Sequence, residues 1–528
     1  MKKFLKIFLI ILLPEIIIFT LISVWEPDKI SQPFDNGTIC LGEKTDIPVS
    51  HATFPELQQE FDSVQQVTKA CLKCHNNVDD QLMLNEHWTW MKEDTIPGKG
   101  KVKMGKENII NNFCVGVATN EELCAKCHAG YGYTVNTFDP NKTENMDCLM
   151  CHDKTGTYAK GAYGNPLPNL DFNYIAKNVG EPGRKNCGFC HFYGGGGNNS
   201  KHGDLEAELV ACSRDIDVHM DKDGLNMSCV DCHKTENHNI PGNLPMVSSS
   251  PGNTTSCTDC HTDSPHKSKL LNDHYNQVSC QTCHIPKYAK AAPTKVYWDW
   301  STAGTVAADG SILDSIYEVT PDTSIRYDSK HGTTTYAKNL KPEYLWHNGY
   351  TDHHFLTDTI VGDTLYLTKL FGSYEDNIHP MDPKHPSKIY PFKIMRGKQP
   401  YDPVNMTLVQ INTFGKKGTG AFWADFDWNK SISNGMEYLG LPWSGEYDFI
   451  YTESHWPVSH MVSPVEQSVS CEECHSNDGI LQNLTGFYLP GRDKSKAIEI
   501  AGILFIILSI LGVATHATLR IISRKKCN

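Results

Sequence analysis

The sequence predicts a fold of short α-helices and irregular loops with minor β structure, enclosed by a transmembrane helix at each end. Three observations predict it: a five-residue motif recurs eight times, an apolar run lies near each terminus, and a long cysteine-free, aromatic-rich stretch separates the last two motifs. The net charge of −13 argues against a nucleic-acid partner and suits a soluble surface or a docking face for basic proteins.

The recurring motif is Cys-x-x-Cys-His, and it accounts for most of the 20 cysteines. Chance predicts roughly 0.04 matches in a chain of this composition. Two thiols three positions apart on one helical turn can each form a thioether with a haem vinyl group, and the adjacent histidine then lies under the iron. Zinc knuckles and thioredoxin-like pairs are the alternatives, but eight copies favour eight covalently bound c-type haems. The predicted attachment residues are Cys71, Cys74, Cys124, Cys127, Cys148, Cys151, Cys187, Cys190, Cys229, Cys232, Cys257, Cys260, Cys280, Cys283, Cys471 and Cys474, and the predicted proximal histidines are His75, His128, His152, His191, His233, His261, His284 and His475.

Residues 1–30 are predicted to form an export signal or anchor helix. Lys2, Lys3 and Lys6 precede an apolar run from Ile7 to about Val24. No small-x-small cleavage site follows this run, so we expect it to be retained as an anchor, with removal as the alternative.

Residues 497–523 are predicted to form the second transmembrane helix. Arg524, Lys525 and Lys526 follow it and should stay in the cytoplasm. Both ends would then lie inside, with the haem domain on the periplasmic side of the inner membrane. A buried core helix is the alternative. His516 within this run could meet a quinone or a partner, or could face another helix.

The motifs are unevenly distributed, since seven crowd residues 71–284 and the eighth begins at Cys471. So few residues per haem cannot form a conventional core, and the short helices and loops must pack around stacked haems. Residues 31–284 are therefore predicted as a seven-haem core. Residues 285–490 are predicted as an aromatic-rich wrap that carries the eighth haem, or alternatively as a separate domain. Alternation over residues 364–368 predicts some strands there.

Electron-transfer haems usually require a second axial histidine, and most of the 24 histidines lie outside the motifs. A solvated surface histidine is the alternative at each position. The candidate distal ligands are His87, His202, His219, His238, His266, His274, and one of His455 or His460.

An enzyme needs at least one iron that is not held by two histidines, and one loop offers a different ligand. Four glycines at positions 194–197 precede Asn198, and Lys201 lies next to His202. Glycines allow the backbone to approach a haem face closely. A flexible exposed loop with a solvated lysine is the alternative.

Several features together resemble the octahaem tetrathionate reductase family, which is related more distantly to hydroxylamine oxidoreductase and pentahaem nitrite reductase. They are the long gap before the last motif, residues 192–204 with their glycine run and Lys201, residues 109–114 ahead of the second motif, and residues 293–304. The resemblance covers residues 65–480.

The resemblance implies that the second haem is catalytic, with His128 as proximal ligand, Lys201 as distal ligand and Cys114 in the pocket. The family loop usually carries an aspartate at the position where this chain has Asn198. Asn198 lacks the carboxyl group that an acid or electrostatic role at this position would need. Cys114 could instead be a small buried side chain, or form a disulfide with Cys212 or Cys40.

The implied activity is reduction of tetrathionate, with nitrite or hydroxylamine as related small inorganic substrates. A quinol-oxidising or other redox cytochrome is the expected partner. The alternative function is a non-catalytic conduit in which all eight irons are six-coordinate.

Overall fold

The computed structural model describes residues 50–134, 137–242, 250–252 and 254–525. The helix predicted over residues 1–30, together with Cys40 and Cys527, lies outside the described residues. The described chain divides into two compact units. Residues 256–276 form the small unit, and the remaining described residues form the large one.

Short helices dominate the first part of the large unit, as predicted. Four of them, α6, α9, α11 and α15, begin at the first cysteine of a motif. Side-chain caps start two of these helices: Asp147 accepts from the Met150 amide at 3.0 Å before α6, and Ser470 accepts from the Glu473 amide at 3.4 Å before α15. The helices of the large unit are α2 (Val64–Leu72), α3 (Val78–Leu82), α4 (Glu86–Thr89), α5 (Glu121–Cys124), α6 (Cys148–His152), α7 (Phe172–Lys177), α8 (Arg184–His191), α9 (Cys229–Cys232), α11 (Cys280–His284), α12 (Tyr374–Ile378), α13 (Phe422–Asp425), α14 (Trp428–Leu439), α15 (Cys471–Cys474) and α16 (Lys496–Lys525), with 3-10 turns η1 (His51–Thr53), η2 (Pro55–Leu57), η3 (Ala125–Cys127), η4 (Thr143–Asn145), η5 (Ala162–Gly164), η6 (Ala207–Val210), η8 (Trp300–Thr302) and η9 (Val465–Gln467).

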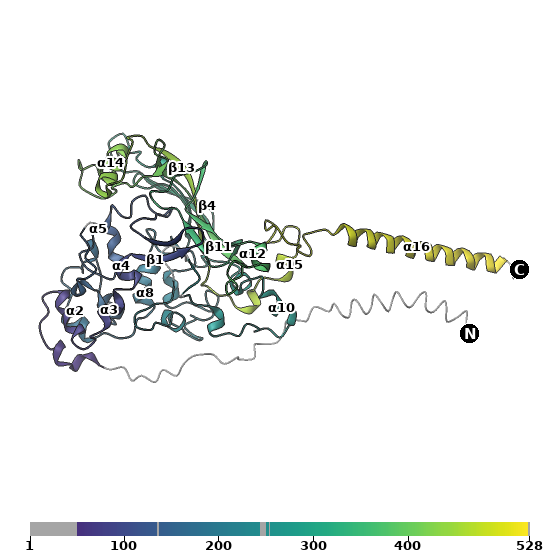
Figure 1. Cartoon of the computed structure of the whole chain (residues 1–528), viewed down its shortest axis with the longest axis horizontal. Coiled ribbons are helices and arrows are strands. Elements are labelled where there is room, and N and C mark those ends of the chain that lie inside the picture. The colour runs from purple at the N-terminus through teal and green to yellow at the C-terminus, as the bar shows by residue number, and fades with distance from the viewer. Residues whose placement is uncertain (1–49, 135–136, 243–249, 253, 526–528) are drawn as a thin grey trace. The chain divides into compact units, whose positions relative to one another are not determined.

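A nine-stranded sheet forms most of the region after the seventh motif, and Figure 1 shows β4, β11 and β13 within it. The order is β4-β5-β6-β3-β11-β13-β9, and β7 and β12 also pair with β11. The strands are β1 (Met91–Ile96), β2 (Gly100–Gly105), β3 (Thr294–Asp299), β4 (Asp314–Thr320), β5 (Thr323–Asp328), β6 (Gly332–Ala337), β7 (Glu343–His347), β8 (Thr351–His353), β9 (Thr364–Tyr366), β10 (Thr368–Leu370), β11 (Lys388–Asp402), β12 (Thr407–Leu408) and β13 (Asp448–Pro457).

This sheet corrects the expectation of minor β structure. The alternating stretch over residues 364–368 does give strands, β9 and β10. The central strand β11, however, is buried along most of its length on both faces, so it shows no alternation that the sequence could reveal. It pairs antiparallel with β13 from Phe392 opposite Pro457 to Tyr401 opposite Asp448.

An aromatic core packs against this sheet and reaches the segment ahead of the second motif. Trp298 and Trp300 stack with ring centroids 4.4 Å apart, and Trp456 belongs to the same buried cluster. Phe113 and Val115 are also buried there. The core therefore fixes the backbone on both sides of Cys114.

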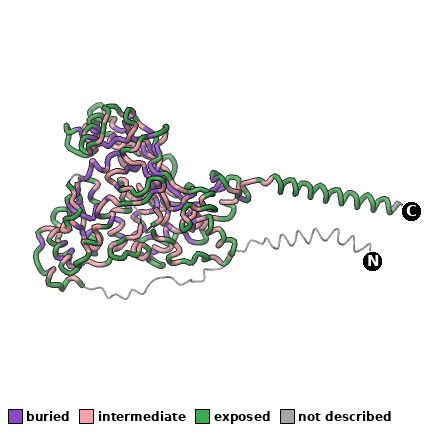
Figure 2. Tube along the Cα trace, viewed as in Figure 1, coloured by how far each residue is buried: buried purple, intermediate pink, exposed green. Residues whose placement is uncertain are grey.

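Helix α16 contains the span predicted over residues 497–523. It is the one helix in the described part of the chain that is long and apolar enough to cross a membrane, with a mean hydropathy of 2.5. Its side chains are exposed from Lys496 to Ser523, as Figure 2 shows, which argues against the alternative of a buried core helix.

The small unit carries the sixth motif. It contains the turn η7 (Cys257–Asp259) and the helix α10 (Lys269–His274). Ser256 begins η7 by accepting from the Thr258 amide at 3.3 Å.

Candidate functional site

At four motifs of the large unit, the motif histidine faces a second histidine at the spacing that a shared iron requires. Two imidazoles that ligate one metal ion place their ring centroids roughly 6 to 6.5 Å apart, since each metal–nitrogen bond is about 2 Å long. In each pair one histidine belongs to a motif. The pairs are His75 with His51 at 6.4 Å, His152 with His238 at 6.4 Å, His191 with His87 at 6.1 Å, and His233 with His460 at 6.3 Å. These residues fit bis-histidine haems at the first, third, fourth and fifth motifs.

Oxygen atoms orient many of the candidate ligand rings through Nδ1. A carbonyl, amide or carboxylate oxygen only accepts, so Nδ1 carries the proton and Nε2 is left to face an iron. The Nδ1 to oxygen distances are 2.9 Å from His152 to Gly180, 2.8 Å from His233 to Pro241, 3.0 Å from His475 to Pro490, 2.8 Å from His87 to Asn85, 2.9 Å from His238 to Gln81 and 3.1 Å from His460 to Asp204.

Contacts between cysteines show which motifs are neighbours. The first motif lies beside the third, the second beside the fourth, and the fourth beside the fifth, because a thiol of one hydrogen-bonds a thiol of the other. The pairs are Cys71 with Cys148, Cys127 with Cys190, and Cys187 with Cys229. Haems attached at these positions would lie in close succession, as electron transfer between them requires.

Lys201 is half-buried beside the second motif. Its Nζ is 5.1 Å from the centroid of the Trp456 ring, and the charges of Cys127 and Cys114 act on it. Burial, and then the charge of Lys106, lower the Lys201 pKa to about 7. A large share of this lysine is therefore the neutral amine near neutral pH, the form whose lone pair can bind a metal.

The glycine run allows the loop to fold closely over Lys201. A Cβ at Gly194 would lie 3.2 Å from Lys201 Cδ, and a Cβ at Gly195 would lie 3.1 Å from Lys201 Cβ. Gly195 also has a φ of +77°, which favours glycine. Lys393 Nζ donates to the Lys201 carbonyl at 2.9 Å and to the Ser200 carbonyl at 3.1 Å. The backbone that carries Lys201 is thus held in place.

Two further lysines, Lys295 and Lys106, surround the same place and were missed by the sequence analysis. Lys295 on β3 is 3% exposed, and its Nζ lies 3.2 Å from the centroid of the Trp298 ring. Burial lowers its pKa to about 7. Both lysines act electrostatically on Cys114. Lys295 lies on β3, a strand that the sequence did not predict. Lys106 follows the hairpin of β1 and β2, whose several lysines are typical of a solvent-exposed surface. Neither residue could therefore be identified as part of the site from the sequence.

Cys114 is a free thiol. Its Sγ accepts from the Gly116 amide at 3.4 Å, and Gln399 donates to its carbonyl at 2.8 Å. Burial raises its pKa above the usual value for a thiol. Cys212 is also free and is buried elsewhere against Leu209, so these two cysteines do not form a disulfide.

Comparison with known proteins agrees with this geometry. The family model for bacterial cytochromes c matches residues 295–478, and the model for cytochrome c7 and related cytochromes c matches residues 212–294. The crystal structure of octahaem cytochrome c from Shewanella oneidensis matches with a TM-score of 0.72 and 41% sequence identity, covering 83% of this chain and 96% of that one. The chain belongs to the multihaem cytochromes c. An uncharacterized protein of Archaeoglobus fulgidus is 27% identical to this cytochrome over 231 residues, which cover 33% of this chain and 75% of that protein.

His128 of this cytochrome does not follow the pattern of the other motif histidines. Its Nε2 hydrogen-bonds the carbonyl of Trp88, whose ring stacks on the imidazole at a centroid distance of 5.4 Å. Its Nδ1 lies beside the Gly130 backbone and makes no hydrogen bond of ordinary geometry within the described residues. Tyr133 and Phe138 pack around the ring, and burial lowers the His128 pKa to about 3. The imidazole is therefore neutral and directed at backbone.

The side chain of Asn198 hydrogen-bonds the segment that follows the Lys201 loop. Its Oδ1 accepts from the Ala207 amide at 2.8 Å, and its Nδ2 donates to the Glu208 carboxylate at 3.3 Å. These contacts stabilise the loop. They engage Asn198 outside the group formed by Lys201, Lys295 and Lys106, the lysine cluster.

The geometry favours His460 over His455 as a distal ligand of this cytochrome. His455 lies on β13, where its Nδ1 is 3.0 Å from Thr368 Oγ1 and its Nε2 is 3.5 Å from a Glu453 carboxylate oxygen. Both ring nitrogens of His455 thus contact neighbouring side chains, Thr368 on β10 and Glu453 on β13, whereas His460 faces His233.

His51 is a candidate ligand that sequence analysis missed. It lies on the turn η1 ahead of the first motif and faces His75. Nothing in the sequence around it separates it from a surface histidine.

The remaining candidate ligands are His202 and His219 in the large unit and His266 and His274 in the small unit. His202 lies 6.5 Å from His191, so it competes with His87 for the fourth haem, and His219 Nδ1 is 3.8 Å from the Asp217 carboxylate. In the small unit, His266 Nδ1 faces Asn272 at 3.2 Å and His274 Nδ1 faces the Leu270 carbonyl at 2.7 Å. These contacts orient both rings through Nδ1.

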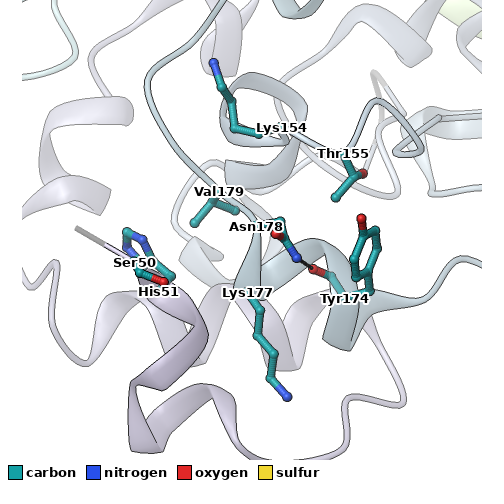
Figure 3. Close-up of a pocket in the computed structure, with 8 residues that line it drawn as sticks. All are labelled: Ser50, His51, Lys154, Thr155, Tyr174, Lys177, Asn178 and Val179. Carbon is teal, nitrogen blue, oxygen red and sulfur yellow. Dashed lines mark hydrogen bonds between the residues drawn. The ribbon is translucent and has the colours of Figure 1, made fainter. Parts of the chain in front are cut away.

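A pocket of about 300 Å³ lies beside His51 rather than beside Lys201. Figure 3 shows the side chains of Lys154 and Lys177 extending in opposite directions, so they do not converge on one anion. The pocket is lined by Ser50, His51, Lys154, Thr155, Tyr174, Lys177, Asn178 and Val179. It belongs to the surroundings of the first haem rather than to the lysine cluster.

Proposed function

We propose that this cytochrome is an oxidoreductase that reduces a small inorganic substrate at the haem of the second motif, with Lys201 as an axial ligand. Tetrathionate is the substrate that the family resemblance favours, and nitrite and hydroxylamine are the related candidates. The observation that carries the proposal is the position of Lys201, which the glycine run holds against Trp456 and near Cys127, and its lowered pKa of about 7 agrees with that position. All eight motifs are taken to carry a haem.

We assign His128 a packing role rather than the proximal role that the resemblance implies. Its Nε2 bond to Trp88 and the aromatic rings around it support this revision. Lys201 would then be the protein ligand of this haem, and the substrate would bind where no protein ligand is assigned. A His128→Leu variant is then expected to keep the ferric spectrum of a lysine-ligated haem. Loss of that spectrum would indicate that His128 is an iron ligand in the wild type.

The lysine cluster suits an anionic substrate. Lys295 and Lys106 supply positive charge within a chain whose net charge is −13, and a buried ammonium attracts an anion more strongly than an exposed one does. Tetrathionate is a dianion, and two electrons cleave its central sulfur–sulfur bond to give two thiosulfate dianions without a proton. The haem, when bound, would supply these two electrons. Cys114 lies where it could contact a sulfur atom of the substrate.

The location that we propose is the inner membrane, with the haem domain on the periplasmic side. The exposed apolar surface of α16 and the basic residues that follow the apolar span, which ends at Ser523, support one anchor. Residues 1–30 would supply the second. A quinol-oxidising or other redox cytochrome would then be the electron donor.

A second candidate function is a conduit that only passes electrons. The four histidine pairs at iron-sharing distance favour it, because such haems conduct and do not bind substrate. It requires the second haem to be held by two strong ligands as well.

Steady-state assays separate these two functions. The purified full-length protein, reduced by a chemical donor, is offered tetrathionate, nitrite and hydroxylamine in turn. We expect turnover of at least one substrate, and we expect Lys201→His to abolish it while the haem content is unchanged. The matched control is Lys417→His, at an exposed lysine far along the sequence. Equal rates in the wild type and Lys201→His would contradict the enzyme proposal, and no turnover at all would favour the conduit.

A further inference from the structure

The loop that carries Lys201 also places a buried carboxylate on a candidate ligand of a different haem. Asp204 is 2% exposed, and its Oδ2 lies 3.1 Å from Nδ1 of His460. The same oxygen accepts from the backbone amides of Ser459 at 2.8 Å and His460 at 3.0 Å. His460 in turn faces His233 of the fifth motif. Asp204 thus both positions His460 and receives its Nδ1 proton.

This partner distinguishes His460 from the other distal candidates of the four described pairs. Nδ1 of His87 meets the amide oxygen of Asn85, and Nδ1 of His238 meets that of Gln81. The Nδ1 of His51 has no hydrogen-bond partner within the described part of the chain. Among these four, only His460 therefore meets a charged acceptor.

Several groups stabilise the Asp204 carboxylate as an anion. His460 and His202 both favour its ionised form, and Lys393 lies close enough for its charge to interact with Asp204. Asp217 adds a second negative charge that acts on His460. Tyr288 also faces Asp204 and remains protonated, because burial raises its pKa well above the usual value. Three hydrogen bonds to Oδ2 fix the position of the carboxylate.

A carboxylate behind a ligating imidazole changes the electronics of the metal. It draws the Nδ1 proton toward itself, makes Nε2 a stronger electron donor, and brings a negative charge near the iron. Each of these effects stabilises ferric over ferrous iron, and burial strengthens all of them.

We infer that Asp204 is a positioning residue that lowers the reduction potential of the fifth-motif haem below those of the third-motif and fourth-motif haems. The fifth motif neighbours the fourth through Cys229 and Cys187, and the fourth neighbours the second through Cys190 and Cys127. A low potential at the fifth haem sends electrons toward the fourth and onward to the second. One loop thereby holds both Lys201 and the residue that directs electrons toward it.

The test is a potentiometric titration of the full-length holoprotein, followed by optical and electron paramagnetic resonance spectra. Asp204→Asn keeps the size of the side chain and an oxygen that can accept the same hydrogen bonds, but it removes the charge. We expect one titrating component to move to a more positive potential while the others, and the haem content, stay as in the wild type. An unchanged titration would overturn the inference, as would an equal shift of every component.

A converse variant controls for a purely structural effect. Gln81→Glu places a carboxylate behind His238 at the third haem without changing side-chain length. It is expected to move a different single component to a more negative potential, by a smaller amount because Gln81 is partly exposed. A shift in the positive direction, or no shift, would contradict the proposed mechanism. Neither variant touches Lys201, so this inference can fail while the proposed enzyme function stands, and the reverse also holds.

Discussion

Lys160 and Asp147 form an ion pair in which both side chains are fully excluded from solvent, with Nζ and Oδ2 2.9 Å apart. The Lys160 ammonium also donates to the carbonyls of His128 and Gly130, the latter at 3.0 Å. The ammonium therefore has three partners, all from the segment that follows the second motif or from Asp147.

Asp147 continues this network into the third motif. It accepts from the hydroxyls of Tyr131 and Tyr158, each at 3.0 Å, and it caps α6 through the Met150 amide. The pair consequently fixes the second haem site against the third.

Replacing Lys160 with methionine should destabilise the protein strongly. The change leaves a buried Asp147 charge without its cation, which typically costs about 3–5 kcal/mol. The thermal unfolding midpoint of the holoprotein is the measurement. Arg214→Met is the control, because the pair between Arg214 and Glu466 is exposed and its loss should leave the midpoint in place. A small shift for Lys160→Met, equal to that of the control, would be inconsistent with a structural role for the buried pair.

Substitution of His460 should open one haem to high-spin ligation, whereas substitution of His455 should not. His460 faces His233 at the distance of a shared iron, and His455 is engaged by Thr368 and Glu453. The ferric electron paramagnetic resonance spectra of His460→Ala and His455→Ala are the comparison. Added imidazole should restore the low-spin signal in the first variant. A high-spin signal from His455→Ala instead would reverse the assignment.

Substrate affinity should fall as pH rises through about 7. The Lys295 pKa is lowered from its usual value to about 7, so its ammonium is present below that pH and is lost above it. An anion loses its partner on the alkaline side, and the KM for tetrathionate is expected to increase there. In Lys295→Met this dependence should be weaker, and kcat/KM at pH 6 should drop by about 10- to 100-fold, the worth of a charged hydrogen bond. A KM that falls with rising pH in the wild type would contradict this role.

Cys114→Ser should separate sulfur substrates from nitrogen substrates. A thiol can contact or attack a sulfur atom of tetrathionate, but it has no such role with nitrite or hydroxylamine. We expect slower tetrathionate turnover at unchanged haem content, and equal rates with the nitrogen compounds. Cys212→Ser, at a thiol buried away from the lysine cluster, is the matched control. Equal losses with all substrates would point to a structural defect.

The parts of this protein that depend on local spacing could be predicted, and the parts that depend on distant contacts could not. Each attachment motif forms within one helical turn, so the sequence alone places α6, α9, α11 and α15. The pairing of His233 with His460 joins segments far apart in the chain, and only the folded structure chooses between His455 and His460.

The candidate site shows the same division. Lys201 was predicted because glycines and a family-like loop surround it, while Lys295 and Lys106 reach it through strands whose lysines resemble solvated ones. The proximal role expected for His128 followed from its motif. Its contact with the Trp88 carbonyl depends on α4, a helix that no motif marks.

The most direct test of the central claim is the ferric electron paramagnetic resonance and near-infrared magnetic circular dichroism spectrum of the holoprotein, compared with that of Lys201→His. We predict a lysine-ligated haem signal in the wild type, its replacement in the variant by the signal of a haem held by a single histidine, and unchanged signals from the other haems. Identical spectra from the two proteins, with histidine-type signals throughout, would contradict the assignment of Lys201 as an iron ligand.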